Sequence, residues 1–242
     1  MKYIKILIVL LFVISCSNDG DTTISNGDGT GGSLAIFALK GNYLYTVDQN
    51  NLNIFAISDT AQPTFVNSVN VGFDIETLFS FDAHLYIGSR NGMFIYDVVN
   101  PENPALLSSV QHFRSCDPVV ANATHSFVTL HSNTDCGSGI NVLQVYDTAD
   151  LSNPLLIHQR TLFSPKGLGL YHNYLILCDD EIKIFDIVNP AEPVLVKAIP
   201  KNCFDVIIKD NDLYAIGESG LYRYTLDNDN ITNVVLQSEI TF

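Results

Sequence analysis

The stretch GMFIYDVVNPENPALLSSV (residues 92–110) decides the fold, because it recurs almost unchanged as EIKIFDIVNPAEPVLVKAI at residues 181–199. In both copies an apolar run typical of a buried strand leads into an Asn-Pro turn, and a second apolar run follows. Proline has no backbone N–H to donate to a neighbouring strand, so the chain must turn at this point. Each copy therefore predicts a β-hairpin that belongs to a larger repeating unit.

Weaker copies of this hairpin run through the chain after residue 33. When the copies are aligned on the aromatic residue of their central strand, successive copies lie 41, 50, 39 and 39 residues apart. A proline follows eight residues after the aromatic in four of the five copies, and two further apolar runs precede every hairpin. The first run of each copy is predicted to be the innermost strand, at residues 34–39, 75–79, 119–121, 168–171 and 206–208. Each unit therefore contains four strands in about 40 residues. The aromatic residues are Phe55, Tyr96, Tyr146, Phe185 and Tyr224, and the prolines are Pro63, Pro104, Pro154 and Pro193.

Four-stranded units of this size cannot bury both of their faces alone, and such units pack around an axis in a β-propeller. The sequence thus predicts an all-β fold, a five-bladed β-propeller of four-stranded antiparallel blades over residues 34–242. A β-solenoid is the alternative, although its rungs are usually shorter. Leu34 already begins an innermost strand and the last copy ends near an outermost one, so we expect no exchange of strands to close the ring.

The central strand and its turn carry a family resemblance. Residues 95–98 (IYDV) and 184–187 (IFDI), each with an Asn-Pro pair shortly after, resemble the LVIVD repeat of bacterial exported proteins, and the resemblance covers about residues 34–242. Two of the five copies depart from the pattern, with Ala56 and Thr225 in place of the aspartate. The resemblance implies a propeller-like fold on an exported protein and no particular activity. We expect the repeated aspartates to make hydrogen bonds in turns; they are Asp97, Asp147 and Asp186.

The first 33 residues predict an export signal and a tether. Lys2 and Lys5 precede an uninterrupted apolar run that ends just before Ser15 and Cys16. This run would rise only about 13–14 Å as a helix, less than half of a bilayer core, so a leader is favoured over a spanning helix. Residues 13–16 resemble the lipobox of bacterial lipoproteins, which implies cleavage before Cys16 and acylation of Cys16; an ordinary secretory peptide is the alternative. We predict a signal peptide at residues 1–15 and a lipidated cysteine with a flexible linker at residues 16–33.

The charge of the chain restricts its partners. The formal net charge is −14, and removal of residues 1–15 takes away two lysines and no acid, which makes it −16. Charge of this sign repels phosphate backbones, so nucleic acid is not expected as a partner. The membrane is expected to be reached through the N-terminal lipid, which places the protein at a bacterial outer membrane, on its periplasmic or its exposed side.

The third copy contains an insertion at residues 131–139, which accounts for its longer spacing. Loops that exceed the pattern of a repeat often carry function. His131, Asp135 and Cys136 in this loop raise the question of a metal ion, but no fourth ligand follows at the spacing of a zinc site. We therefore expect neither a metal nor another cofactor.

Four cysteines remain once Cys16 is assigned to lipid. We predict a disulfide between Cys116 and Cys136, because both belong to the third copy and the bond would tie its insertion to the start of the innermost strand. Cys178 and Cys203 either pair or remain buried thiols.

Acidic residues precede the innermost strands of three units, at Asp74, Asp117 and Asp205. If they meet at one mouth of the channel, they would bind a cation, a sugar or a cationic peptide, or supply the carboxylate pair of a glycoside hydrolase. The favoured alternative is that each aspartate accepts hydrogen bonds from backbone amides of its turn. Mutual repulsion would raise the pKa of at least one carboxyl, whereas backbone bonds would lower it.

No Ser-His-Asp, GxSxG, Walker or HExxH arrangement occurs, so no catalytic residue is predicted. The sequence favours a lipid-anchored, non-enzymatic propeller that captures a ligand or an unidentified protein or glycan partner. The alternative is a glycoside hydrolase or lyase that uses carboxylates at the channel mouth.

The lipid anchor is tested by replacing Cys16. In a lipoprotein-producing bacterium fed a labelled fatty acid, the parent chain should carry the label and sediment with membranes, and Cys16→Ser should do neither. A Cys16→Ser protein that is still labelled and membrane-bound would contradict the assignment.

Overall fold

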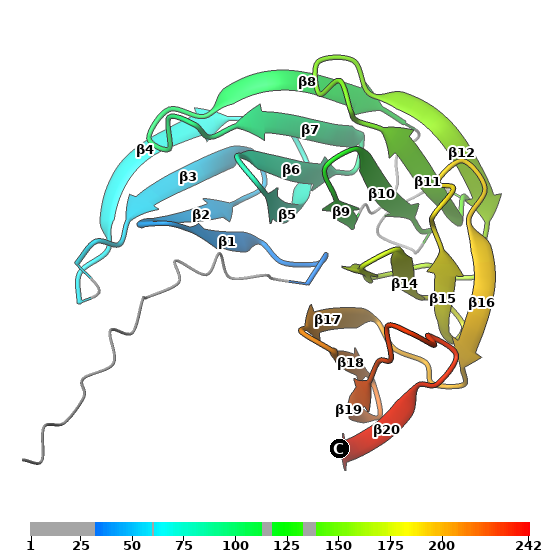
Figure 1. The fold of residues 1–242 in the computed structure, drawn as a ribbon. Coiled ribbons are helices and arrows are strands. Elements are labelled where there is room, and N and C mark those ends of the chain that lie inside the picture. Colours follow the sequence, from blue (N-terminus) through cyan, green and yellow to red (C-terminus); the bar gives the residue numbers. More distant parts are fainter. Residues whose placement is uncertain (1–31, 60, 113–117, 133–138) are drawn as a thin grey trace, which may run out of the picture.

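The computed structural model describes residues 32–59, 61–112, 118–132 and 139–242, and all regular structure in these residues is β. In these described ranges, twenty strands form five antiparallel sheets of four, and each sheet consists of four consecutive strands. The five sheets are arranged around an axis as the blades of a five-bladed β-propeller (Figure 1). The predicted fold is confirmed. Within the described ranges no helix is long and apolar enough to cross a membrane.

In every blade the first strand lies at the axis and the fourth at the rim (Figure 1). Blade 1 contains β1 (Phe37–Lys40), β2 (Tyr43–Val47), β3 (Asn51–Ala56) and β4 (Thr64–Asn70), and blade 2 contains β5 (Ile75–Phe81), β6 (His84–Ser89), β7 (Gly92–Asp97) and β8 (Ala105–Gln111). Blade 3 contains β9 (Val119–Ala121), β10 (His125–Leu130), β11 (Val142–Asp147) and β12 (Leu155–Thr161), and blade 4 contains β13 (Leu168–Tyr171), β14 (Tyr174–Cys178), β15 (Ile182–Asp186) and β16 (Val194–Ile199). Blade 5 contains β17 (Asp205–Lys209), β18 (Asp212–Gly217), β19 (Gly220–Thr225) and β20 (Val235–Thr241).

The repeated aspartates hold the turn between the third and fourth strands. The carboxylate of Asp97 accepts a hydrogen bond from the N–H of Val99 at 2.6 Å, and the matching bond at Asp186 comes from the N–H of Val188 at 2.8 Å. Asp147 accepts the same bond from Ala149 at 2.9 Å. The structural role predicted for these aspartates is confirmed.

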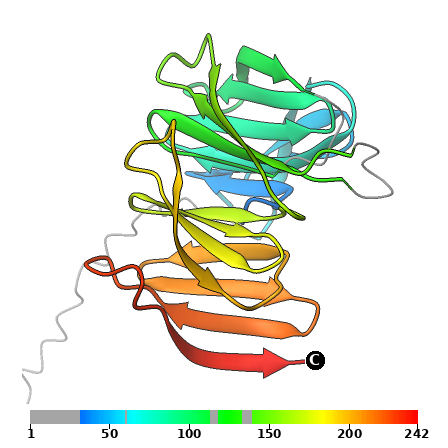
Figure 2. The ribbon, with the colours of Figure 1, turned by 90° about the vertical axis from the view of Figure 1, so that its right-hand side faces the viewer.

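A β-bulge interrupts the pairing of the third and fourth strands at the same place in all five blades. It always falls immediately before the aromatic residue on which the copies align, for example between Ile184 and Phe185 in blade 4. A bulge adds twist and bends the strand. The long rim strands therefore curve around the molecule in the same way in every blade (Figures 1 and 2).

The apolar cores lie between blades. Four clusters of buried apolar side chains fill the junctions of blades 1 and 2, 2 and 3, 3 and 4, and 4 and 5. Innermost strands of consecutive blades contact one another from β1 to β17, whereas β17 and β1 make no comparable contact, although both strands are fully described. The blades thus form an arc that is open between blades 1 and 5, without strand exchange (Figure 1).

A short segment ahead of β1 crosses the axis to blades 4 and 5. The hydroxyl of Ser33, which is fully buried, accepts a hydrogen bond from the N–H of Leu168 at 2.8 Å and donates to the carboxylate of Asp205 at 3.4 Å. A Cβ atom at Gly32 or Gly167 would collide with this carboxylate, so glycine permits the close approach. Burial raises the pKa of Asp205 to about 6 and outweighs the hydrogen bonds that favour its charged form.

Removal of a turn carboxylate should destabilise the fold modestly. Asp186→Ala loses one hydrogen bond to a backbone amide, and we expect the free energy of unfolding to fall by about 1 kcal/mol in urea titrations. Glu192→Ala, an exposed acid of the same turn, should change it by less than about 0.5 kcal/mol. Equal effects of the two variants would show that Asp186 does not stabilise the turn.

The raised pKa of Asp205 predicts a pH dependence of stability. From about pH 4 to about pH 6 the folded state keeps a proton that the unfolded chain has lost, so the free energy of unfolding should fall as the pH rises, by up to about 3 kcal/mol. Asp205→Asn removes this titration, so the stability of the variant relative to the parent should rise through the same window. Urea unfolding at pH 4, 5, 6 and 7 measures the difference, with Glu218→Gln, an exposed acid, as control. Parallel profiles for parent and Asp205→Asn would contradict the assignment.

Candidate functional site

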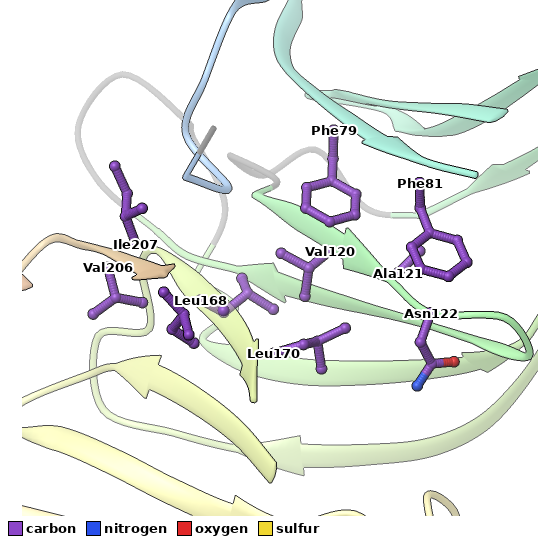
Figure 3. Close-up of a pocket in the computed structure, with 11 residues that line it drawn as sticks. Phe79, Phe81, Val120, Ala121, Asn122, Leu168, Leu170, Val206 and Ile207 are labelled. Atoms are coloured by element: carbon purple, nitrogen blue, oxygen red, sulfur yellow. The ribbon is translucent and has the colours of Figure 1, made fainter. Parts of the chain in front are cut away.

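The propeller axis holds an apolar pocket of about 240 Å³. Figure 3 shows side chains from the innermost strands of blades 2 to 5, which converge on the pocket from different sides. Asn122 is the one polar side chain among the residues that line it. The lining residues are Phe79, Phe81, Val120, Ala121, Asn122, Leu168, Gly169, Leu170, Val206, Ile207 and Ile208.

The sequences of the innermost strands explain why the pocket is apolar. The described part of β9 reads Val-Val-Ala and is buried at all three positions, and β13 and β17 are apolar at most positions. Gly169 lets β13 lie close to β17, because a Cβ atom there would be 3.0 Å from a methyl carbon of Ile208. A longer side chain at Gly169 would therefore occupy space between the two strands.

A lining of this kind suits binding rather than proton transfer. Transfer of apolar surface out of water contributes about 25 cal/mol per Å², and the amide of Asn122 can orient one polar atom of a ligand. None of the lining side chains is ionisable. The pocket can therefore take up a small apolar molecule or an apolar group that projects from a larger one.

The structure describes two of the three predicted acids, Asp74 and Asp205. Asp205 lies at the axis, where it is covered by Ser33. Asp74 lies at the junction of blades 1 and 2, where its backbone has a φ of 55° and its carbonyl oxygen accepts a hydrogen bond from the N–H of Arg90. Asp117 is outside the described residues, so the predicted three-acid site stays a prediction.

The pKa of Asp205 follows neither of the two expectations from the sequence. Its carboxylate accepts a hydrogen bond from the N–H of Val206 at 2.9 Å, which by itself would lower the pKa. Burial is the largest contribution and raises the pKa instead, and repulsion by another acid is not among the causes. The lowered pKa expected for a backbone-bonded aspartate is therefore wrong at this position.

The insertion of blade 3 joins β10 to β11, as its position in the sequence predicted. Asp135 and Cys136 fall outside the described residues, as does Cys116, so the disulfide between Cys116 and Cys136 remains a prediction. In the part of the chain that is described, no group of three or more His, Cys, Asp or Glu side chains is placed to hold a metal ion.

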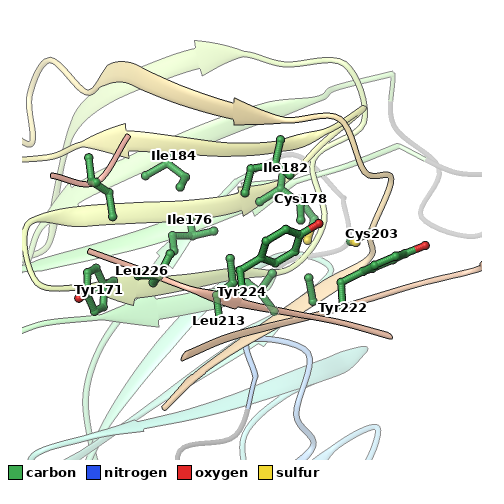
Figure 4. Packing of buried hydrophobic residues seen from close by; sticks show 14 residues of the cluster. Tyr171, Ile176, Cys178, Ile182, Ile184, Cys203, Leu213, Tyr222, Tyr224 and Leu226 are labelled. Atoms are coloured by element: carbon green, nitrogen blue, oxygen red, sulfur yellow. The ribbon is translucent and has the colours of Figure 1, made fainter. Parts of the chain in front are cut away.

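Cys178 and Cys203 are free, buried thiols in the core between blades 4 and 5 (Figure 4). Burial raises the pKa of both, to about 11 for Cys203. Both thiols are therefore protonated and unreactive near neutral pH.

The axial pocket was not predicted from the sequence, although a signal for it is present. The runs at residues 168–171 and 206–208 were assigned to innermost strands, and their side chains are apolar at consecutive rather than alternating positions. A strand that is apolar on both of its sides has an apolar neighbour on each side. Here the two sides face the preceding and the following blade, and the pocket lies at the axis where four such strands meet.

Solved structures with a similar fold share little sequence with this chain. A protein from Lactobacillus plantarum aligns with a TM-score of 0.66 at 9% identity, over 83% of this chain and 68% of that one. The periplasmic gluconolactonase PpgL of Pseudomonas aeruginosa aligns with a TM-score of 0.63 at 11% identity, over the same shares. Hsv2 of Kluyveromyces lactis aligns with a TM-score of 0.55 at 12% identity, over 83% of this chain and 60% of that one. At these identities the similarity concerns the fold alone.

No curated protein matches the sequence significantly. The LVIVD repeat family matches residues 31–71, 83–112 and 166–199, which fall in blades 1, 2 and 4. Two of these matches contain Asp97 and Asp186, whose hydrogen bonds hold the turns described above. The chain therefore carries the LVIVD repeat in three of its five blades.

Proposed function

We propose that this protein is an exported, lipid-anchored binding module that captures a ligand through its axial pocket, without catalysing a reaction. The observation that carries the proposal is the composition of the pocket, which is apolar except for Asn122. The ligand class that fits is a small apolar molecule or the apolar end of a larger partner.

The route to the membrane is part of the same proposal. The leader, the lipobox-like residues before Cys16 and the linker to residue 33 support attachment to a bacterial outer membrane, on its periplasmic or exposed side. A net charge of −16 on the mature chain keeps the blades away from anionic head groups. The propeller would therefore be held beside the membrane by its lipid and linker.

A glycoside hydrolase or lyase is the alternative function. A carboxyl whose pKa is raised to about 6, as that of Asp205 is, would suit a general acid in mildly acidic solution. Such an enzyme needs a second carboxyl about 5–10 Å away in an open pocket. Asp205 is instead covered by Ser33, and the pocket beyond it has no ionisable lining, which favours binding over hydrolysis.

Filling the pocket should weaken binding of a neutral apolar probe. We expect N-phenyl-1-naphthylamine to bind the parent saturably, with the fluorescence increase of a dehydrated site. Gly169→Leu should weaken this binding by at least about tenfold, because its side chain would enter the space between Val206 and Ile208. Gly169→Ala should have a smaller effect in the same direction.

Gly139→Leu is the matched control, because a Cβ atom at Gly139 meets no atom within 4 Å. Its probe binding should equal that of the parent, and circular dichroism should show that all variants remain folded. Unchanged binding in folded Gly169→Leu, or no saturable binding in the parent, would overturn the pocket as the site.

A further inference from the structure

One sheet face of blade 1 is apolar and has no blade against it. We name it the front face of blade 1, and it contains Phe37, Leu39, Leu44 and Phe55. Phe37 is 55% exposed and Leu39 is 38% exposed. The residues at the position of Phe37 in the other four blades are at most 1% exposed; they are Leu78, Val119, Leu168 and Val206.

The sequence keeps this face apolar although none of the other four described blades covers it. Phe55 is the first of the five aromatic residues on which the repeat aligns, and it is partly exposed, whereas the other four are at most 5% exposed. Leu44 pairs with Phe55, and the groove that the front face borders, about 310 Å³, is lined by Ile36, Phe37, Leu39, Leu44 and Thr46. An uncovered apolar groove of this kind marks an interaction surface.

The packing of the other blades shows which kind of surface covers a front face. In the other four blades the front face packs against the opposite face of the preceding blade, which we call its back face. Blade 5 has a back face with no following blade. Its Ile207 is 43% exposed and its Ile240 is 63% exposed, and Tyr214, Ile216 and Leu221 on the same face are partly exposed.

Arg223 distinguishes the back face of blade 5 from the others. The other blades have Ile or Val at this position, and all four of those side chains are fully buried; they are Ile54, Ile95, Val145 and Ile184. Ile184 belongs to the same core cluster as Tyr222 and Tyr224 (Figure 4). By strand register, Asn53 and Phe55 of blade 1 occupy the positions of Tyr222 and Tyr224. Packing blade 5 on blade 1 in this geometry brings Arg223 to Phe55 and Asn53.

This pairing matches the chemistry of both sides. A guanidinium stacks favourably on an aromatic ring. The side-chain oxygen of Asn53 accepts a hydrogen bond from the hydroxyl of Ser68 at 2.8 Å and has a second lone pair for another donor. The protein already contains such a contact, because Arg160 of blade 3 lies 5.1 Å from the ring centre of Phe185, the residue of blade 4 that aligns with Phe55. The one charged residue at this position of a back face therefore has a suitable partner on the front face of blade 1.

The geometry favours contact of the two faces between different copies of the chain. In the structure the arc holds blades 1 and 5 apart, and the four packed junctions between them set that separation. Closing the ring within one chain would require all four close-packed cores to change their angles, which close packing resists. Contact between copies leaves every core intact.

We propose that the front face of blade 1 binds the back face of blade 5 of a second copy of this chain, as consecutive blades bind each other within the chain. The contact is head to tail, with Arg223 of one copy against Phe55 of the other. It is independent of the ligand proposed for the axial pocket.

Sedimentation velocity tests the association, with the full chain carrying Cys16→Ser so that no lipid contributes. From about 1 to about 100 μM, the parent should shift from monomer to larger species. Phe37→Glu should remain a monomer throughout. Phe163→Glu replaces an equally large, 72% exposed side chain away from both faces and should behave as the parent does. A parent that stays monomeric at all concentrations, or equal behaviour of the two variants, would overturn the proposal.

Thiol crosslinking tests the predicted partners. Packed sheets lie about 10 Å apart, so a bismaleimide of about that reach should join Asn53→Cys on one copy to Arg223→Cys on another. An equal mixture of the two variants should yield crosslinked dimers several-fold above either variant alone and above the parent background. Crosslinks in Asn53→Cys alone would indicate a different contact, and intrachain crosslinking in the double variant would indicate closure of the ring; either result would overturn the proposal.

Discussion

Every blade of this propeller needs a neighbour to bury its faces, and the rest of the structure depends on this constraint. Side chains alternate between the two faces of a strand, so a four-stranded sheet with apolar residues on both faces must pack on both sides. The aligned aromatics meet this need at four junctions, where Tyr96, Tyr146, Phe185 and Tyr224 are nearly inaccessible to solvent. Because each junction fixes the angle between two blades, four junctions fix the arc and the width of its opening.

The repeat made most of this architecture predictable from the sequence. The spacing of the aromatics and prolines identified the four-stranded unit, and the innermost strands at Val119–Ala121 and Leu168–Tyr171 have the predicted bounds. Asp97 and Asp186 were predictable for the same reason, because an Asx turn requires only an acid and an amide two residues later. Features that depend on a few neighbouring residues are encoded locally and can be inferred from one sequence.

The features that could not be predicted are those in which distant segments meet. Ser33 contacts Leu168 and Asp205, which are 135 and 172 residues away, and no periodic pattern reports such contacts. The pKa of Asp205 depends on burial by these segments, so the sequence alone did not determine whether this pKa is raised or lowered. Whether the ring closes depends on the sum of the angles between all consecutive blades. The sequence of a single blade does not determine this sum.

The open ends of the arc differ in a way that bears on how the protein associates. Terminal repeats of stacked arrays usually carry a polar outer face. Blade 5 meets this requirement in part, because Arg223 is paired with Asp212 at 2.8 Å on its back face, whereas the front face of blade 1 exposes Phe37 and Leu39. Burial of Arg223 in a contact carries a desolvation penalty for its guanidinium. Stacking on Phe55 offsets about 1–2 kcal/mol of this penalty. The balance favours a reversible head-to-tail contact whose extent depends on the local concentration of the chain.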